Sequence, residues 1–327
     1  MIETLLPPLQ RAFLFCGVLL LVGAVAWRGC VAPWQPPPLR PLMRKVECRL
    51  TRVAFWVTNI LLCTWLVRLG VQVMEFRDPF APLRDDVRFL LMETFWGSVW
   101  MAQGSLLVFL AGTFHFLARR ARGKRERERR ALEGGEVQEA EAGPGVTLPR
   151  TWKGAGTGIL LLALTLSLSS HAMSVPLVAP LAVAMDTVHA LAAGAWIGTL
   201  ALIVGLRLPG REGSGALAGQ LRAFSYLALA SVPLLLLTGL MLSGFHVGEL
   251  RNLWASGYGR VLSLKILTAA GVLLIGFRNW RYGLAQADEE PGARSVRRWA
   301  ATEVGLAAGV VLLTAILVGM PMPEGVH

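Results

Sequence analysis

Two ionisable side chains interrupt an otherwise apolar stretch of the chain, MDTVHALAAGAWIG at residues 185–198. Asp186 and His189 are spaced i, i+3, so both project from one face of a helix, and Trp196 continues that face. A carboxylate at the centre of a bilayer costs about 2.5–3.5 kcal/mol, so such groups usually face the interior of a bundle and serve a function. The pair therefore marks a candidate site.

Further donors of the same kind fall at the ends of neighbouring apolar runs. Imidazole and thioether together suit copper, and thioether favours Cu(I). Asp186 could ligate Cu(II), or it could orient a ligand imidazole by accepting its N–H. The candidate copper ligands are His171, Met173, Asp186, His189 and His246. The alternative is that the histidines are hydrogen-bonding helix-end residues and that the methionine only fills apolar space.

The elements that must position these residues are long apolar runs. The chain has 327 residues, 54% of them hydrophobic and 16% charged, with a mean hydropathy of +0.54. A helix of about 20 residues crosses the hydrocarbon core of a bilayer. Eight such runs occur, at 12–32, 53–73, 94–118, 155–172, 180–206, 224–246, 260–283 and 299–320. The sequence predicts an all-α polytopic membrane bundle of about eight transmembrane helices.

The net charge of +11 is a signal of membrane topology. Basic residues crowd the segments at 40–52, 119–130, 207–222 and 294–298, whereas the alternate loops near 80, 175 and 250 carry little net positive charge. Cationic loops stay in the cytoplasm, so both termini are predicted to lie outside, as are His171, His189 and His246. We do not expect the protein to bind nucleic acid.

Charge also divides the chain into segments. Residues 1–118 form a predicted three-helix membrane segment, 119–153 a charged cytoplasmic linker with too few apolar residues for a core, and 154–327 a five-helix membrane domain. The third span could extend as a helix into the start of the linker. The Pro-rich turn at 33–41 is expected to be extended. Residues 11–26 could pass for a signal peptide, but we interpret them as the first span, because cleavage would leave the cationic 40–52 segment outside.

The remaining polar groups have structural interpretations. Lys265 is expected to reach the interface or to pair with Asp186, and Glu303 to meet Arg278 or Arg281. Gly194 and Gly198 form a GxxxG spacing that lets another helix approach closely. The four cysteines, Cys16, Cys30, Cys48 and Cys63, show no disulfide pattern. His115 and Cys63 could serve as inward stations for a metal ion.

The segment DTVHALAAGAWIGTLALI at 186–203 resembles the signature of the copper resistance protein D (CopD) family. The resemblance continues through SHA at 170–172, FSYLALASVPLLLLTGL at 224–240, YGRVLSLKILTAAGVLL at 258–274 and TEVGLAAGVVLLTAILVGMP at 302–321. It is looser in the first half, at TFWGSVWMAQGSLL (94–107).

This resemblance implies a protein of the cytoplasmic (inner) membrane that handles copper, as Cu(I) or Cu(II), with import the usual proposal. By position it favours His171, Asp186 and His189 as ligands, with Met173 and His246 as further candidates. Family members often work beside a periplasmic copper-binding domain of the CopC type. Because no such domain is expected at either end of this chain, the resemblance implies a separate donor.

Three other functions stay open. The first is a membrane electron carrier that holds heme b between paired histidines. The second is a factor that delivers copper to a partner enzyme without transporting it. The third is a membrane enzyme. It is disfavoured because the sequence shows no nucleophile or substrate cleft near Asp186 and His189, so we expect no enzymatic activity. The sequence contains no Walker-type GxxxxGK[ST] and no CPC pair.

Overall fold

The chain folds into a bundle of long helices. A computed structural model describes residues 2–78, 80, 82–133, 149–169, 179–206, 211–247 and 251–320. Within these ranges every regular element is helical, and eight helices are long and apolar enough to cross a membrane. The predicted all-α polytopic membrane bundle is therefore confirmed.

The helices follow the apolar runs of the sequence and extend beyond most of them. In chain order they are α1 (Ile2–Ala26), η1 (Trp27–Val31), η2 (Ala32–Trp34), η3 (Pro37–Leu39), α2 (Arg40–Glu75), α3 (Leu83–Met92), α4 (Phe95–Glu133), α5 (Arg150–Leu168), α6 (Ala179–Ala193), η5 (Gly194–Gly198), α7 (Thr199–Gly205), α8 (Arg211–Val247), α9 (Asn252–Ala255), α10 (Gly257–Arg278), η6 (Asn279–Gly283), η7 (Leu284–Gln286) and α11 (Glu290–Leu317). The elements η1, η5 and η6 are π-helical.

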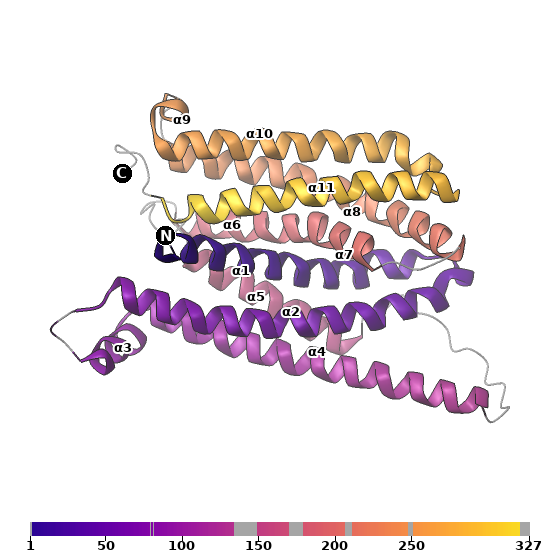
Figure 1. The fold of residues 1–327 in the computed structure, drawn as a ribbon, viewed down its shortest axis with the longest axis horizontal. Helices are drawn as coiled ribbons and strands as arrows, with labels where there is room; N and C mark the ends of the chain where they lie inside the picture. The colour runs from indigo at the N-terminus through magenta and orange to yellow at the C-terminus, as the bar shows by residue number, and fades with distance from the viewer. Residues whose placement is uncertain are drawn as a thin grey trace.

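Helix α1 is the central element of the bundle. It packs against α2, α5, η5, α7 and α11, and it runs between the α2–α4 pair and the α10–α11 pair (Figure 1). Its buried residues, among them Leu21 and Val22, belong to the main hydrophobic core. At its end the Trp27 indole donates a 2.8 Å hydrogen bond to Oε1 of Gln220, which ties the first span to α8.

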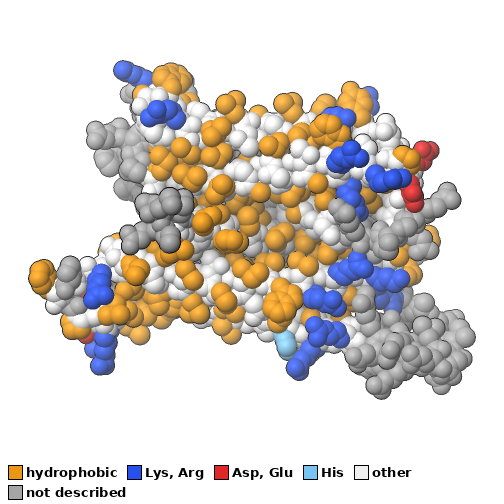
Figure 2. All heavy atoms as spheres, in the orientation of Figure 1, with side chains coloured by type: hydrophobic (Ala, Val, Ile, Leu, Met, Phe, Trp, Pro, Cys, Tyr) orange, Lys and Arg blue, Asp and Glu red, His pale blue; other side chains and the backbone are white. Residues whose placement is uncertain are grey.

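The two ends of the bundle differ in charge. Helix α1 begins and helix α11 ends at the same end (Figure 1). On the face shown in Figure 2, most Lys and Arg side chains gather at the opposite end, beyond an apolar middle. Exposed arginines at that end include Arg119, Arg278 and Arg281. This separation of the cationic end from the start of α1 and the end of α11 is consistent with the loop charges of the sequence, and the direction of the bundle in the membrane stays a prediction.

The predicted GxxxG contact joins η5 to α1. A Cβ atom on Gly198 would overlap the carbonyl oxygen of Leu19, and one on Gly194 would lie 2.5 Å from Cβ of Val22. The Thr199 hydroxyl also donates a 3.2 Å hydrogen bond to the carbonyl of Gly23. The two glycines therefore allow backbone-to-backbone packing, as small residues do between membrane helices.

Helices α2 and α4 are joined by a reciprocal tryptophan pair. The rings of Trp65 and Trp100 stack with centroids 3.9 Å apart. Each indole donates to the other residue's backbone carbonyl, at 2.8 Å from Trp65 and 3.1 Å from Trp100. These bonds satisfy both N–H groups within an apolar contact.

Two local expectations were incomplete or wrong, and a third is confirmed. The Pro-rich turn at 33–41 is not extended throughout, because it contains the 3₁₀ turns η2 and η3 and α2 already begins at Arg40. Proline is tolerated at these first helical positions, where its missing N–H has no acceptor in any case. Helix α3, which follows the predicted loop near residue 80, was not foreseen. The expected extension of the third span is confirmed, since α4 continues to Glu133.

Candidate metal-binding cavity

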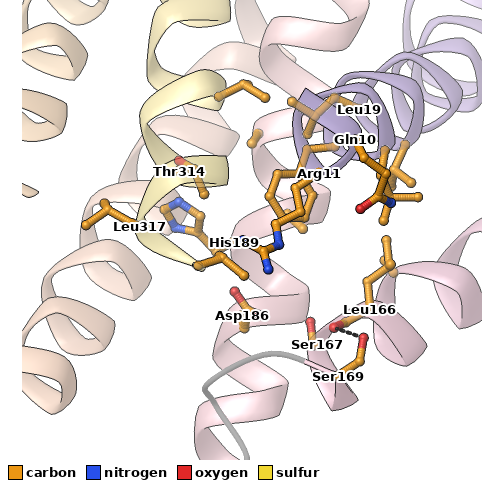
Figure 3. Close-up of a pocket in the computed structure, with 18 of the residues that line it drawn as sticks. Gln10, Arg11, Leu19, Leu166, Ser167, Ser169, Asp186, His189, Thr314 and Leu317 are labelled. Carbon is orange, nitrogen blue, oxygen red and sulfur yellow. Dashed lines mark hydrogen bonds between the residues drawn. The ribbon is translucent and has the colours of Figure 1, made fainter. Parts of the chain in front are cut away.

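A cavity of about 430 Å³ lies among the helices, toward the end of the bundle where α1 begins and α11 ends. Its walls come from helix segments far apart in sequence, including the first half of α1, the end of α5, the second half of α6 and the end of α11. His189 and Asp186 both line it, as their spacing on α6 predicted. Figure 3 shows these two side chains with Arg11 and Ser167 around the same space.

Helix α8 fixes the orientation of the His189 ring. Nδ1 of His189 lies 2.9 Å from Oγ1 of Thr238. The Thr238 hydroxyl donates its own proton to the carbonyl of Leu234 at 2.6 Å, so it accepts from the imidazole. The next residue is Gly239, where a Cβ atom would lie only 3.2 Å from Cε1 of the ring.

The hydrogen bond decides which ring nitrogen is available. With Nδ1 protonated and donating to Thr238, a neutral His189 carries its lone pair on Nε2. An N–H held by an oxygen acceptor is the usual arrangement of a metal-binding histidine, because it fixes the tautomer and raises the basicity of the other nitrogen. Nε2 of His189 could therefore coordinate a metal ion. Among the described residues that line the cavity, no second histidine is present.

Charged side chains of both signs share the cavity. Three cations and two carboxylates line it, namely Arg11, Arg68, Lys265, Glu75 and Asp186, which leaves one net positive charge when His189 is neutral. Lys265 and Asp186 lie close enough to attract each other electrostatically, as the sequence suggested. Asp186 is half-buried.

Sequence reasoning missed the contributions of the first three spans. Arg11 lines the cavity from α1, and the neighbouring Gln10 is 7% exposed with its Nε2 unpaired. Arg68 of α2 donates from Nη1 to Oε1 of Gln103 on α4 at 2.9 Å. Arg68 is a polar residue inside an apolar run, the same signal that singled out Asp186, whereas Gln10 and Arg11 lie just before the first run. Thr238, in LLLLTGL, carries that signal as well.

Three of the five predicted ligands cannot be placed in this cavity. His171 and Met173 lie outside the described residues. His246 belongs to the last turn of α8, but its side chain is not among those described. Among the described residues no group of three or more His, Cys, Asp or Glu side chains is arranged to hold a metal ion. The described part of the site thus consists of His189, Asp186 and their partners.

Two predicted inward stations lie elsewhere. His115 and Cys63 are exposed on the outer surface of the bundle, and neither lines the cavity. The ring of His115 instead lies 5.6 Å from that of Phe55. All four cysteines are free, as predicted.

The fold and the cavity define a multi-pass helical membrane protein. Residues 218–317 match the family model of copper resistance protein D, which supports the resemblance that the motifs indicated. No curated protein and no solved structure matches the chain. The match associates this part of the chain with copper resistance. The matched region supplies Gly239 and Lys265 to the cavity wall and Thr238 to the His189 ring, whereas Asp186 and His189 precede it.

Proposed function

We propose that the cavity around His189 captures copper on the extracytoplasmic side of the inner membrane and that the bundle passes the ion to the cytoplasm. The main support for this proposal is the hydrogen bond from Nδ1 of His189 to Thr238. It leaves the lone pair of Nε2 free to coordinate a metal ion at the cavity wall. The match of residues 218–317 to a copper resistance family supports copper as the ion.

The remaining ligands are supplied by neighbouring segments. Asp186 lies one turn before His189 on α6 and lines the same cavity. Ser169, at the end of α5, also lines it, and the sequence continues through His171 and Met173. Imidazole and thioether are ligands that bind copper well. His246 at the end of α8 is the further candidate.

The charges in the cavity favour the monovalent ion. A net positive lining repels Cu(II) about twice as strongly as Cu(I), because the Coulomb energy is proportional to the charge of the ion. Neutral nitrogen and sulfur ligands also suit Cu(I). We therefore propose Cu(I) as the form transported, delivered by a periplasmic donor of the CopC type. No nucleotide-binding motif occurs in the sequence, so movement follows the gradient of copper or of another ion.

Uptake into proteoliposomes tests this function. The purified chain, reconstituted with a Cu(I) chelating dye inside the vesicles, is expected to give copper-dependent dye signal that His189→Ala reduces to the level of empty vesicles. The control is His115→Ala, an exposed histidine outside the cavity, which should transport as the wild type does. Copper binding without flux in the wild type would contradict transport and favour a delivery factor.

A further inference from the structure

A second cavity of about 680 Å³ lies at the other end of the bundle. Helix α10 connects the two, because Lys265 lines the first cavity and Gly276 the second. Helix α8, the segment η5 and helix α11 complete its walls. Most of the lining is apolar, and its polar groups are concentrated at Glu303 and Asn279.

Glu303 is a buried carboxylate without a cationic partner. Its side chain is 3% exposed, Nδ2 of Asn279 donates to its Oε2 at 3.2 Å, and the indole N–H of Trp196 also donates to the carboxylate. The predicted partners are turned elsewhere: Arg278 lies over the Trp299 ring at 4.0 Å and Arg281 over Tyr282 at 5.5 Å. No Lys, Arg or His nitrogen lies within ion-pair distance of Glu303 in the described ranges. An unpaired buried charge is costly, so this carboxylate calls for a ligand or a proton.

Asn279 adds a second acceptor to the same wall. Its Oδ1 is buried and has no hydrogen-bond partner, while its Nδ2 is occupied by Glu303. Native proteins rarely leave such an atom unsatisfied. Asn279 and Trp196 also belong to the π-helical segments η6 and η5, and π-helical turns within α-helices occur frequently at functional sites.

The rest of the cavity matches an apolar molecule. Trp196, Phe277 and Trp280 provide aromatic walls, and at Gly276 a Cβ atom would lie 3.0 Å from Oε1 of Glu303 and 3.5 Å from the Trp196 ring. Phe277 is 58% exposed on the apolar outside of the bundle. The cavity is therefore bounded by side chains that meet lipid, and its volume is in the range of small-molecule sites.

We propose that this cavity binds a primary ammonium group attached to an apolar body and admitted from the lipid. The ammonium has three donors and a positive charge, which complement the Glu303 carboxylate, Oδ1 of Asn279 and the faces of the aromatic rings. A bare metal ion fits less well, because hard cations need about six oxygen ligands and soft ones need sulfur or imidazole. The site is independent of the proposed copper cavity.

Binding of n-octylammonium to the purified full-length chain tests the proposal, with 1-octanol as a neutral probe of the same apolar body. Tryptophan fluorescence reports binding, since Trp196 and Trp280 line the cavity. We expect saturable quenching by octylammonium at a concentration roughly tenfold or more below that for octanol, which corresponds to about 1.4 kcal/mol. Equal potency of the two probes, or no saturation by octylammonium, would overturn the proposal.

Variants locate the site. Glu303→Gln should abolish the preference for octylammonium, whereas Glu290→Gln, an exposed acid in the first turn of the same helix, should keep it. Asn279→Leu removes the other acceptor and should reduce the preference, which gives a second reading if Glu303→Gln fails to fold. If every folded variant at Glu303 and Asn279 still prefers octylammonium to octanol, the amine binds elsewhere and the proposed site is wrong. Copper uptake by Glu303→Gln should persist, which separates this site from the first.

Discussion

Nδ1 of His189 and Oγ1 of Thr238 lie 2.9 Å apart, and the threonine hydroxyl is committed to the carbonyl of Leu234. This relationship between α6 and α8 settles the tautomer of a neutral imidazole and directs the lone pair to Nε2. It also links the histidine to the region that matches the copper resistance family, since Thr238 falls within residues 218–317.

Replacing Thr238 should weaken copper binding without removing a ligand. Thr238→Val keeps the shape of the side chain but removes the acceptor for the imidazole N–H, so the ring loses its fixed tautomer. Copper affinity should fall by roughly 10–100-fold, as is typical when the partner of a metal-binding histidine is lost. Isothermal titration calorimetry with Cu(I) measures this change in affinity. Thr268→Val, at a threonine of α10 that bonds only its own helix, is the matched control and should bind copper normally.

The close contact between η5 and α1 predicts opposite effects of two glycine substitutions. Gly198→Ala would push a methyl group into the carbonyl of Leu19, which is backbone and cannot turn away. Overpacking of this kind should lower the free energy of unfolding by about 1–3 kcal/mol. Gly112→Ala in α4 meets nothing within 4 Å and should be neutral or stabilising by up to about 1 kcal/mol. Denaturant titration of both variants in detergent checks this pair, and equal behaviour would argue against the packing.

Much of this architecture was legible in the sequence, for a physical reason. A helix in lipid must be long and apolar, so each of the eight spans can be recognised from its own stretch of sequence. The close helix contact at the two glycines of η5 was also predictable, because a GxxxG spacing commonly allows membrane helices to pack closely. Helix α3 was missed because a short amphipathic helix of ten residues leaves a weak periodic signal among charges.

The cavity was only half predictable. The spacing of Asp186 and His189 established that they share a face of α6, but it carried no information about the element opposite that face. Arg11 and Thr238 are separated from His189 by more than 40 residues, and only packing of α1 and α8 brings them beside it. Glu303 was expected to meet Arg278 or Arg281, yet those cations stack on aromatic rings and Asn279 meets the carboxylate.

The position of the cationic end predicts the direction of the bundle in the membrane. Arginine-rich segments remain in the cytoplasm, so Gly123, near the end of the long α4 helix, should be cytoplasmic and the C-terminus should be outside. Alkaline phosphatase fused after residue 327 should be active, and green fluorescent protein fused after Gly123 should fluoresce. The reverse pattern would place the His189 cavity on the cytoplasmic side and contradict capture from outside.

The spectrum of the purified protein distinguishes copper from heme. A heme b carrier needs two axial histidines, and in the described part of the cavity His189 is the histidine present. We therefore expect no Soret band from the protein as isolated, and none after incubation with hemin and removal of the excess. A Soret band that His189→Ala abolishes would instead establish an electron carrier and replace the copper proposal.

The central claim is that His189 binds the copper ion, and titration of the His189→Ala variant tests it most directly. Cu(I) competition against a chelator of known affinity, applied to the wild type, His189→Ala and the exposed-histidine control His115→Ala, gives stoichiometry and affinity together. We expect His189→Ala to lose one bound copper ion, or to bind it far more weakly than Thr238→Val does. The wild type and His115→Ala should both keep that ion. Unchanged stoichiometry and affinity in His189→Ala would contradict the central claim.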